Sequence, residues 1–137
     1  GIQGLGAALV ASPHPDPIQA VSDLLLSYCD LFESFDKPMM LDLTVASLRA
    51  QELMPEMMQL DALIVAQLSE LLSTLRDRGD IDPALCPEDV TMALYGAYAT
   101  PAMLLITSDA LSLDDTRAMA CAQVRLLFTG LRPRTKE

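Results

Sequence analysis

The stretch VTMALYGAYATPAMLLITS, Val90 to Ser108, carries no charged residue and contains Gly96 and Pro101. Its length approaches that of an apolar helix that can span a membrane. Acidic residues flank it at Asp89 and Asp109, and the Lys/Arg asymmetry that orients a membrane span is missing. We therefore expect a buried helix of a soluble protein, and a membrane-associated hairpin of the last two helices remains the alternative.

This helix has three different sides when its residues are placed at helical spacing. One side is bulky, with Val90, Leu94, Tyr98, Pro101 and Leu105, and a second side holds Met92, Tyr95, Ala99, Met103 and Ile106. Another side is mostly small, with Ala93, Gly96, Ala97 and Thr100, and small residues let a neighbouring helix come close. A helix that is apolar on every side must be covered on every side, so we expect the mostly small side to make its closest contact with another helix.

The composition predicts one all-α domain over residues 1–137. Apolar residues make up 51% of the chain and aromatic residues only 4%, and Leu, Ala and Met are good helix formers. A chain of this length can bury a core without disulfides or metals. We expect a bundle of five to six helices.

Start and stop signals divide the chain into helices. Asp16 and Pro17 start a helix that we expect to reach residue 35, and Asp36 starts a shorter one. The third is expected from Pro55 to Arg78, with Gly79 as its C-terminal cap. The last is expected over residues 113–131, after a Ser112 and Asp115 pair typical of a capping box.

Charge and cysteine content limit the class of protein. The net charge of −10 argues against nucleic-acid binding by this chain itself, since phosphate contacts need a basic face. Three cysteines without metal-binding spacing indicate buried thiols in a reducing cytoplasm: Cys29, Cys86 and Cys121. The chain does not begin with Met, and we expect it to be a fragment of a longer protein.

No motif for catalysis is present in the sequence. A Gly-rich phosphate loop, HExxH, GxSxG and CxxC are all missing, and the chain has a single histidine, His14. We expect that the chain is not an enzyme and has neither a cofactor nor a metal site.

A small-molecule pocket is the remaining candidate site. Met39, Met40, Met54, Met57 and Met58 gather between the second and third predicted helices, where methionine fills irregular space or adapts to apolar ligands. With a few polar and aromatic residues they would form a mostly apolar pocket. The candidate ligand-binding residues are Tyr28, Phe32, Met57, Met58, Gln67 and Tyr95.

The order of elements resembles a known family. Four segments carry this resemblance, in their order along the chain: LRDRGDID (75–82), DPALCPEDV (82–90), ALYGAYATPAMLL (93–105) and VRLLFTGLRP (124–133). Together they resemble the C-terminal regulatory domain of the bacterial tetracycline-repressor (TetR) family of transcription regulators.

The resemblance implies a homodimeric domain that binds an effector. It implies that the last two long helices form a four-helix bundle with a second copy, and that a small apolar or aromatic effector binds between the preceding helices. The predicted dimer residues are Ala93, Gly96, Ala97, Thr100, Ala120, Gln123 and Leu127. It also implies a cytoplasmic repressor that binds operator DNA only through an N-terminal helix-turn-helix domain, which this chain lacks. A dimerisation-only module, with the pocket filled by its own side chains, remains an alternative.

Overall fold

The computed structural model describes residues 2–34, 36–49 and 55–131. The elements in these ranges are α1 (Ile2–Ala11), α2 (Pro17–Cys29), the 3₁₀ helix η1 (Asp30–Ser34), α3 (Lys37–Arg49), α4 (Pro55–Asp77), α5 (Pro87–Thr107) and α6 (Leu113–Leu131). No strand occurs among the described residues. The prediction of an all-α chain is confirmed.

Two of the predicted N-terminal caps, at Asp16 and Ser112, are formed. The Asp16 carboxylate accepts a hydrogen bond from the backbone N–H of Ile18 at 3.0 Å, and α2 begins with proline. Ser112 and Asp115 form a reciprocal pair, in which each backbone N–H donates to the other's side chain at 3.0 Å. Both caps satisfy N–H groups that have no partner within the helix, which fixes where α2 and α6 begin.

The end of α4 is fixed by Gly79. Its φ of 85° lies in the left-handed region, where a residue with a Cβ is strained. The N–H of Gly79 donates to the Arg76 carbonyl and the N–H of Asp80 to the Leu75 carbonyl, which is the Schellman pattern. Ile81 follows and is 2% exposed, so the cap returns the chain to the core.

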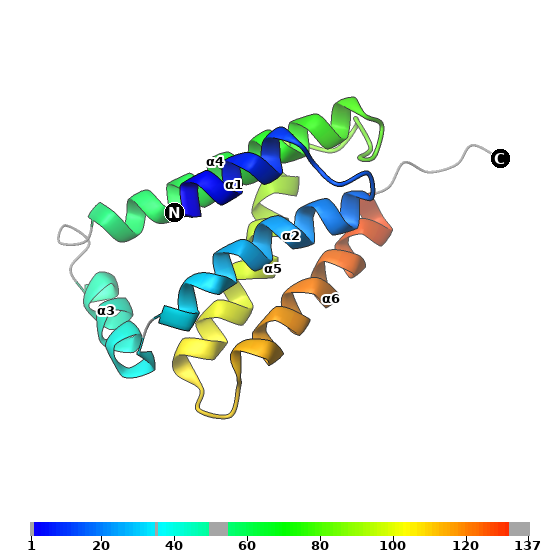
Figure 1. Ribbon diagram of the computed structural model, residues 1–137. Coiled ribbons are helices and arrows are strands. Elements are labelled where there is room, and N and C mark those ends of the chain that lie inside the picture. The colour runs from blue at the N-terminus through cyan, green and yellow to red at the C-terminus, as the bar shows by residue number, and fades with distance from the viewer. Residues whose placement is uncertain (1, 35, 50–54, 132–137) are drawn as a thin grey trace.

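Helix α2 lies at the centre of the bundle. It contacts α1, α4, α5 and α6 (Figure 1), and Val21, Leu24, Leu25 and Tyr28 are fully buried. The α-helix ends at Cys29, and the 3₁₀ turn η1 continues to Ser34, where an α-helix to residue 35 was expected.

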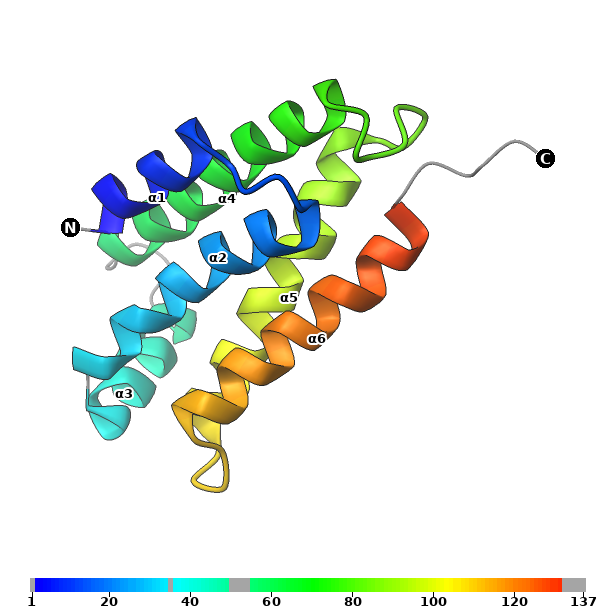
Figure 2. The same cartoon turned by 45° about the vertical axis from the view of Figure 1, so that its right-hand side comes forward.

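The helices that contact α2 lie on two sides of it. Helix α1 lies along α4 on one side, and α6 lies beside α2 and α5 on the other (Figures 1 and 2). Helix α3 stands at the end of the bundle and packs mainly on α5. Because α3 contacts so little, Thr44 is its one buried side chain among those the structure describes.

One side of α5 is buried and the opposite side is exposed. The bulky side of Val90, Leu94, Tyr98, Pro101 and Leu105 is buried, and the helix continues through Pro101. Exposed large side chains lie on the other side: Met92 (55%), Met103 (45%) and Leu104 (40%). The single chain therefore does not cover this helix on all sides.

Helix α5 is also the one described helix that is long and apolar enough to cross a membrane. Its most apolar window has a mean hydropathy of 1.4 and is 44% buried. Core helices of soluble proteins pass the same test, so length and composition are weak evidence for a span.

The cysteines differ in exposure. Cys29 is buried, which raises the pKa of its thiol to about 11, and Cys121 is partly buried. Cys86 is exposed, in contrast to the expectation of three buried thiols. It is the N-cap residue of α5, and its thiol donates to the Glu88 carboxylate at 3.2 Å.

Candidate functional site

Three tyrosines form a row through the interior, which we call the tyrosine row. Tyr28 on α2 meets Tyr98 on α5 edge to face, with ring centroids 5.7 Å apart. Tyr98 meets Tyr95, three residues earlier on α5, at 6.3 Å. Edge-to-face and tilted contacts at such distances are favourable between aromatic rings. The row therefore ties α2 to α5.

Helix α4 supplies a polar partner at each end of the row. The Tyr28 hydroxyl donates to Gln67 Oε1 at 2.6 Å in the buried interior. The Tyr95 hydroxyl donates to Asp61 Oδ1 at 3.0 Å near the surface. A buried hydroxyl group is stable only when it is hydrogen-bonded, so Gln67 holds the Tyr28 ring in place, and Asp61 adds a bond to Tyr95 at the surface.

All three tyrosines have raised pKa values. Burial disfavours the charged phenolate and raises the pKa of Tyr28 and of Tyr98 far above the ordinary value. Burial, followed by the nearby Asp61 carboxylate, raises the pKa of Tyr95 to about 12. The hydroxyls are therefore neutral near pH 7, where they can donate hydrogen bonds but cannot act as bases.

The structure brings together half of the predicted ligand-binding residues. Tyr28 and Gln67 are hydrogen-bonded, and Tyr95 joins them through Tyr98. Phe32 lies on η1 and is half-buried against the core. It lines a surface cavity away from the tyrosine row. The side chains of the predicted residues Met57 and Met58 lie outside the described residues.

Tyr98 and Asp61 were missed from the sequence as members of this group. Tyr98 was assigned to the bulky packing side of α5. It follows Tyr95 by three residues, and side chains at this spacing are neighbours on a helix, so the sequence did carry a signal for this pair. Asp61 carries no comparable sequence signal, because its pairing with Tyr95 depends on how α4 packs against α5.

Gly6 on α1 closes the interior end of the row. A Cβ at this position would overlap the Gln67 amide, whose Cδ would lie 2.8 Å away. Gln67 is 7% exposed and Tyr28 is fully buried. In this conformation the chain's own side chains fill the space beside Tyr28.

Two surface cavities lie away from the tyrosine row. One, of about 200 Å³, lies between the end of α4 and the start of α5 and is lined by Ser73, Arg76 and Leu85 among others. The other, of about 150 Å³, lies between η1, α3 and the corner from α5 to α6. Among the described residues, no cluster of three His, Cys, Asp or Glu could hold a metal ion.

The predicted dimer residues divide into exposed and buried groups. Ala93 and Thr100 are exposed on α5, and Gly96 is partly exposed beside them. On α6, Gln123 and Leu127 are partly buried. These five residues are at least partly accessible on the single chain.

Ala97 and Ala120 do not lie on this surface. Each is 1% exposed, inside the single chain. Their small side chains allow the helices of the single chain to pack closely. Small residues favour close helix packing within a chain as well as between two chains. They are therefore unavailable to a second copy in this conformation, and the interface prediction must be corrected at both positions.

Among the residues whose burial the structure describes, Leu126 on α6 is the most exposed large apolar one, at 73%. With Met92, Met103 and Leu104 on α5, it marks the exposed apolar sides of the two C-terminal helices.

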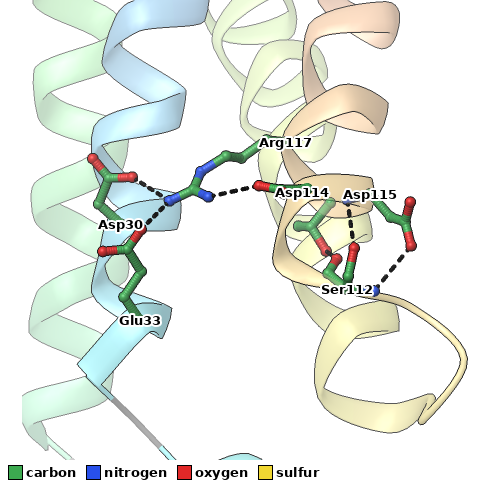
Figure 3. A network of polar contacts seen from close by, with 7 residues as sticks. Asp30, Glu33, Ser112, Asp114, Asp115 and Arg117 are labelled. Atoms are coloured by element: carbon green, nitrogen blue, oxygen red, sulfur yellow. Dashed lines mark hydrogen bonds and ion pairs between the residues drawn. The ribbon is translucent and has the colours of Figure 1, made fainter.

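Arg117 joins α6 to η1 through a network of carboxylates (Figure 3). Its guanidinium donates to Asp30 at 2.8 Å, to Glu33 at 2.5 Å and to Asp114 at 3.1 Å. Hydrogen bonds to Asp30 and Glu33 raise the pKa of Arg117 further above its ordinary value. The network fixes the end of α2 against the start of α6.

Comparison of the chain with protein-family models, with curated proteins and with solved structures finds no significant match.

Proposed function

We propose that this chain is the dimerisation and effector-binding domain of a TetR-like transcription regulator. The observation that carries the proposal is the exposed apolar surface of the last two helices. Met92, Met103 and Leu104 on α5 and Leu126 on α6 are 40% to 73% exposed, although these two helices pack against each other. Large apolar side chains that are exposed on neighbouring helices are candidates for an interaction site.

A second copy of the chain fits this surface best. Met92, Gly96 and Met103 recur at helical spacing on one side of α5, and this helix has no charged residue from Val90 to Thr107. A symmetric dimer places the same patch of both copies face to face, so an uncharged patch meets no like charge. The resemblance to the TetR family supports the same pairing as a four-helix bundle.

The effector would bind beside the tyrosine row, in an arrangement of the chain in which Gln67 leaves the space that it fills here. Three rings with hydroxyl groups, together with Gln67 and Asp61, offer apolar surface and a few directed hydrogen bonds, which small-molecule sites combine. An effector that binds one arrangement of the two protomers better than the other would shift DNA binding by a domain outside this chain.

A dimerisation-only module is the second candidate function. It is favoured by the bond between Tyr28 and Gln67 and by the contact of Gly6 with Gln67, which fill the interior without a ligand. A thermal-shift screen with apolar and aromatic compounds separates the two candidates, because a ligand that binds only the folded chain raises its Tm. No shift across a broad panel would favour the module without an effector.

Light scattering on two matched variants tests the dimer surface. Met103→Glu places a charge on the exposed side of α5, and Met39→Glu places one on α3 at nearly the same exposure, 45% against 46%. We expect Met103→Glu to raise the dimer Kd by about tenfold or more, because it buries an unpaired charge between the copies. Met39→Glu should leave the dimer Kd unchanged. Equal dimer Kd values for both variants and the parent would contradict the proposed surface.

A further inference from the structure

The cavity of about 150 Å³ beside α3 has a mostly apolar wall from four segments of the chain. Its apolar lining consists of Phe32, Met40, Leu105, Ile106, Leu111 and Leu113. An apolar cavity of about this volume can take up one benzene molecule. The space therefore matches one six-membered ring or a chain of similar size.

Lys37 places a positive charge in the wall of this cavity. Its ammonium group donates to the backbone carbonyls of Ser108 at 2.8 Å and of Leu111 at 2.9 Å. An ammonium group has three N–H donors, so these two bonds fix its position and leave one donor. Lys37 is therefore a preorganised cation in the wall of an apolar space.

Ser112 adds a second donor to the lining and follows Leu111, whose carbonyl accepts a hydrogen bond from Lys37. Its Oγ accepts the N–H of Asp115 in the cap of α6, so its own O–H hydrogen remains available. It also marks the N-terminus of α6, where the helix dipole favours negative charge. Two side-chain donors in the wall of a mostly apolar space favour a ligand with acceptor oxygens.

The acidic residues at the start of α6 are already engaged. Asp114 accepts a hydrogen bond from Arg117, and Asp115 accepts one from the backbone of Ser112. Arg117 also offsets part of the charge of Asp30 and Glu33 on η1. Among the described residues that line the cavity, Lys37 is the single basic one.

We infer that this cavity binds a small carboxylic acid with one benzene-sized apolar group. The carboxylate would accept hydrogen bonds from Lys37 Nζ and the Ser112 hydroxyl, and the apolar group would lie between Phe32, Met40 and Ile106. This site is distinct from the proposed effector site, because no residue of the tyrosine row lines it. A bound acid would join α3 to the corner between α5 and α6.

Titration of the full chain with benzoate, followed by amide chemical shifts, tests the site. Benzyl alcohol is the matched ligand, because it has the same ring without the charge. We expect benzoate to shift the amides of residues 37–40 and 105–113 and to bind about tenfold or more tightly than benzyl alcohol, the factor given by about 1.4 kcal/mol. This comparison uses the parent chain alone and does not depend on the folding of a variant.

Two variants test the apolar part and the charged part of the cavity separately. Met40→Trp fills the apolar part and Lys37→Met removes the charge, and each should weaken benzoate binding about tenfold or more. Met39→Trp, at the neighbouring exposed position, should bind benzoate like the parent. The inference is overturned if benzoate causes no shifts, if benzyl alcohol binds equally well, or if the shifts centre on the tyrosine row. The oligomeric mass of the same samples tests the proposed dimer separately.

Discussion

Gly6 and Gln67 determine how the space beside Tyr28 is filled. The Gln67 amide lies where a side chain at position 6 would lie, and the same amide accepts the hydroxyl hydrogen of fully buried Tyr28. Gly4, on the same helix, has no atom within 4 Å of an added Cβ. The two glycines therefore have different roles although they stand two residues apart.

Gly6→Ala should destabilise the chain, and Gly4→Ala should stabilise it. Alanine at position 4 gains about 0.5–1 kcal/mol from helix propensity. Alanine at position 6 must displace Gln67, and loss of the bond to Tyr28 costs about 1–3 kcal/mol. Urea unfolding of both variants measures the difference. Equal stabilisation of both would show that Gln67 does not occupy this space.

The tyrosines should not titrate at their ordinary pKa of 10.0. Each folded-state pKa lies above this value, so the stability gained by keeping the rings neutral is fully present below pH 10.0. It is lost as the pH rises through the folded-state values, of which that of Tyr95 is about 12. Tyrosinate absorbance should therefore appear only well above pH 10.0, together with loss of helical circular dichroism. A normal titration with helicity retained would contradict the burial of the row.

At the scale of the helices, the Arg117 network is the main polar link between η1 and α6. It lies near the surface, where each exposed ion pair contributes about 0.2–1 kcal/mol and is screened by salt. Arg125 is exposed on the same helix, and no ion pair of its side chain occurs among the described residues.

Arg117→Met should lower the free energy of unfolding by about 1 kcal/mol at low salt, and by less at high salt. Arg125→Met should change it little, because arginine and methionine have similar helix propensities. Thermal unfolding at two salt concentrations checks both expectations. A salt-independent loss for Arg117→Met would indicate that the stem of the side chain, not its charge, holds η1 to α6.

Most helices could be predicted from the sequence because their ends carry local signals. The caps at Asp16, Ser112 and Gly79 depend on residues within one turn, and all three are formed as predicted. The 3₁₀ turn after Cys29 was not predicted, since the apolar spacing continues through Phe32 without a break.

The site could be predicted only in part, for a physical reason. The pattern of Tyr28, Gln67 and Tyr95 indicated an interior polar and aromatic group, and the three do lie together. Which residues complete the group depends on the relative rotation of α4 and α5, which no local signal encodes. The same limit explains why Ala97 was assigned to a dimer surface although it packs inside the chain.

At the scale of the whole molecule, substitutions of Ala97 and Ala93 distinguish effects on the folding of the protomer from effects on dimerisation. Ala97 is buried within the single chain, whereas Ala93 is exposed on the same helix. Ala97→Glu should destabilise the protomer itself by about 2 kcal/mol or more, because it buries a charged group. Ala93→Glu should leave the protomer folded and weaken the dimer.

Circular dichroism and light scattering on the two variants check this separation. We expect unfolding at lower urea for Ala97→Glu and a folded chain of lower mass for Ala93→Glu. A folded dimer for Ala93→Glu would place the interface elsewhere on α5.

The central claim is that a second copy covers the exposed apolar sides of α5 and α6. The mass of the parent chain, measured by light scattering over a range of micromolar concentrations, tests it most directly. The claim predicts twice the chain mass of 14.8 kDa, without detergent. A mass of 14.8 kDa throughout that range would contradict it.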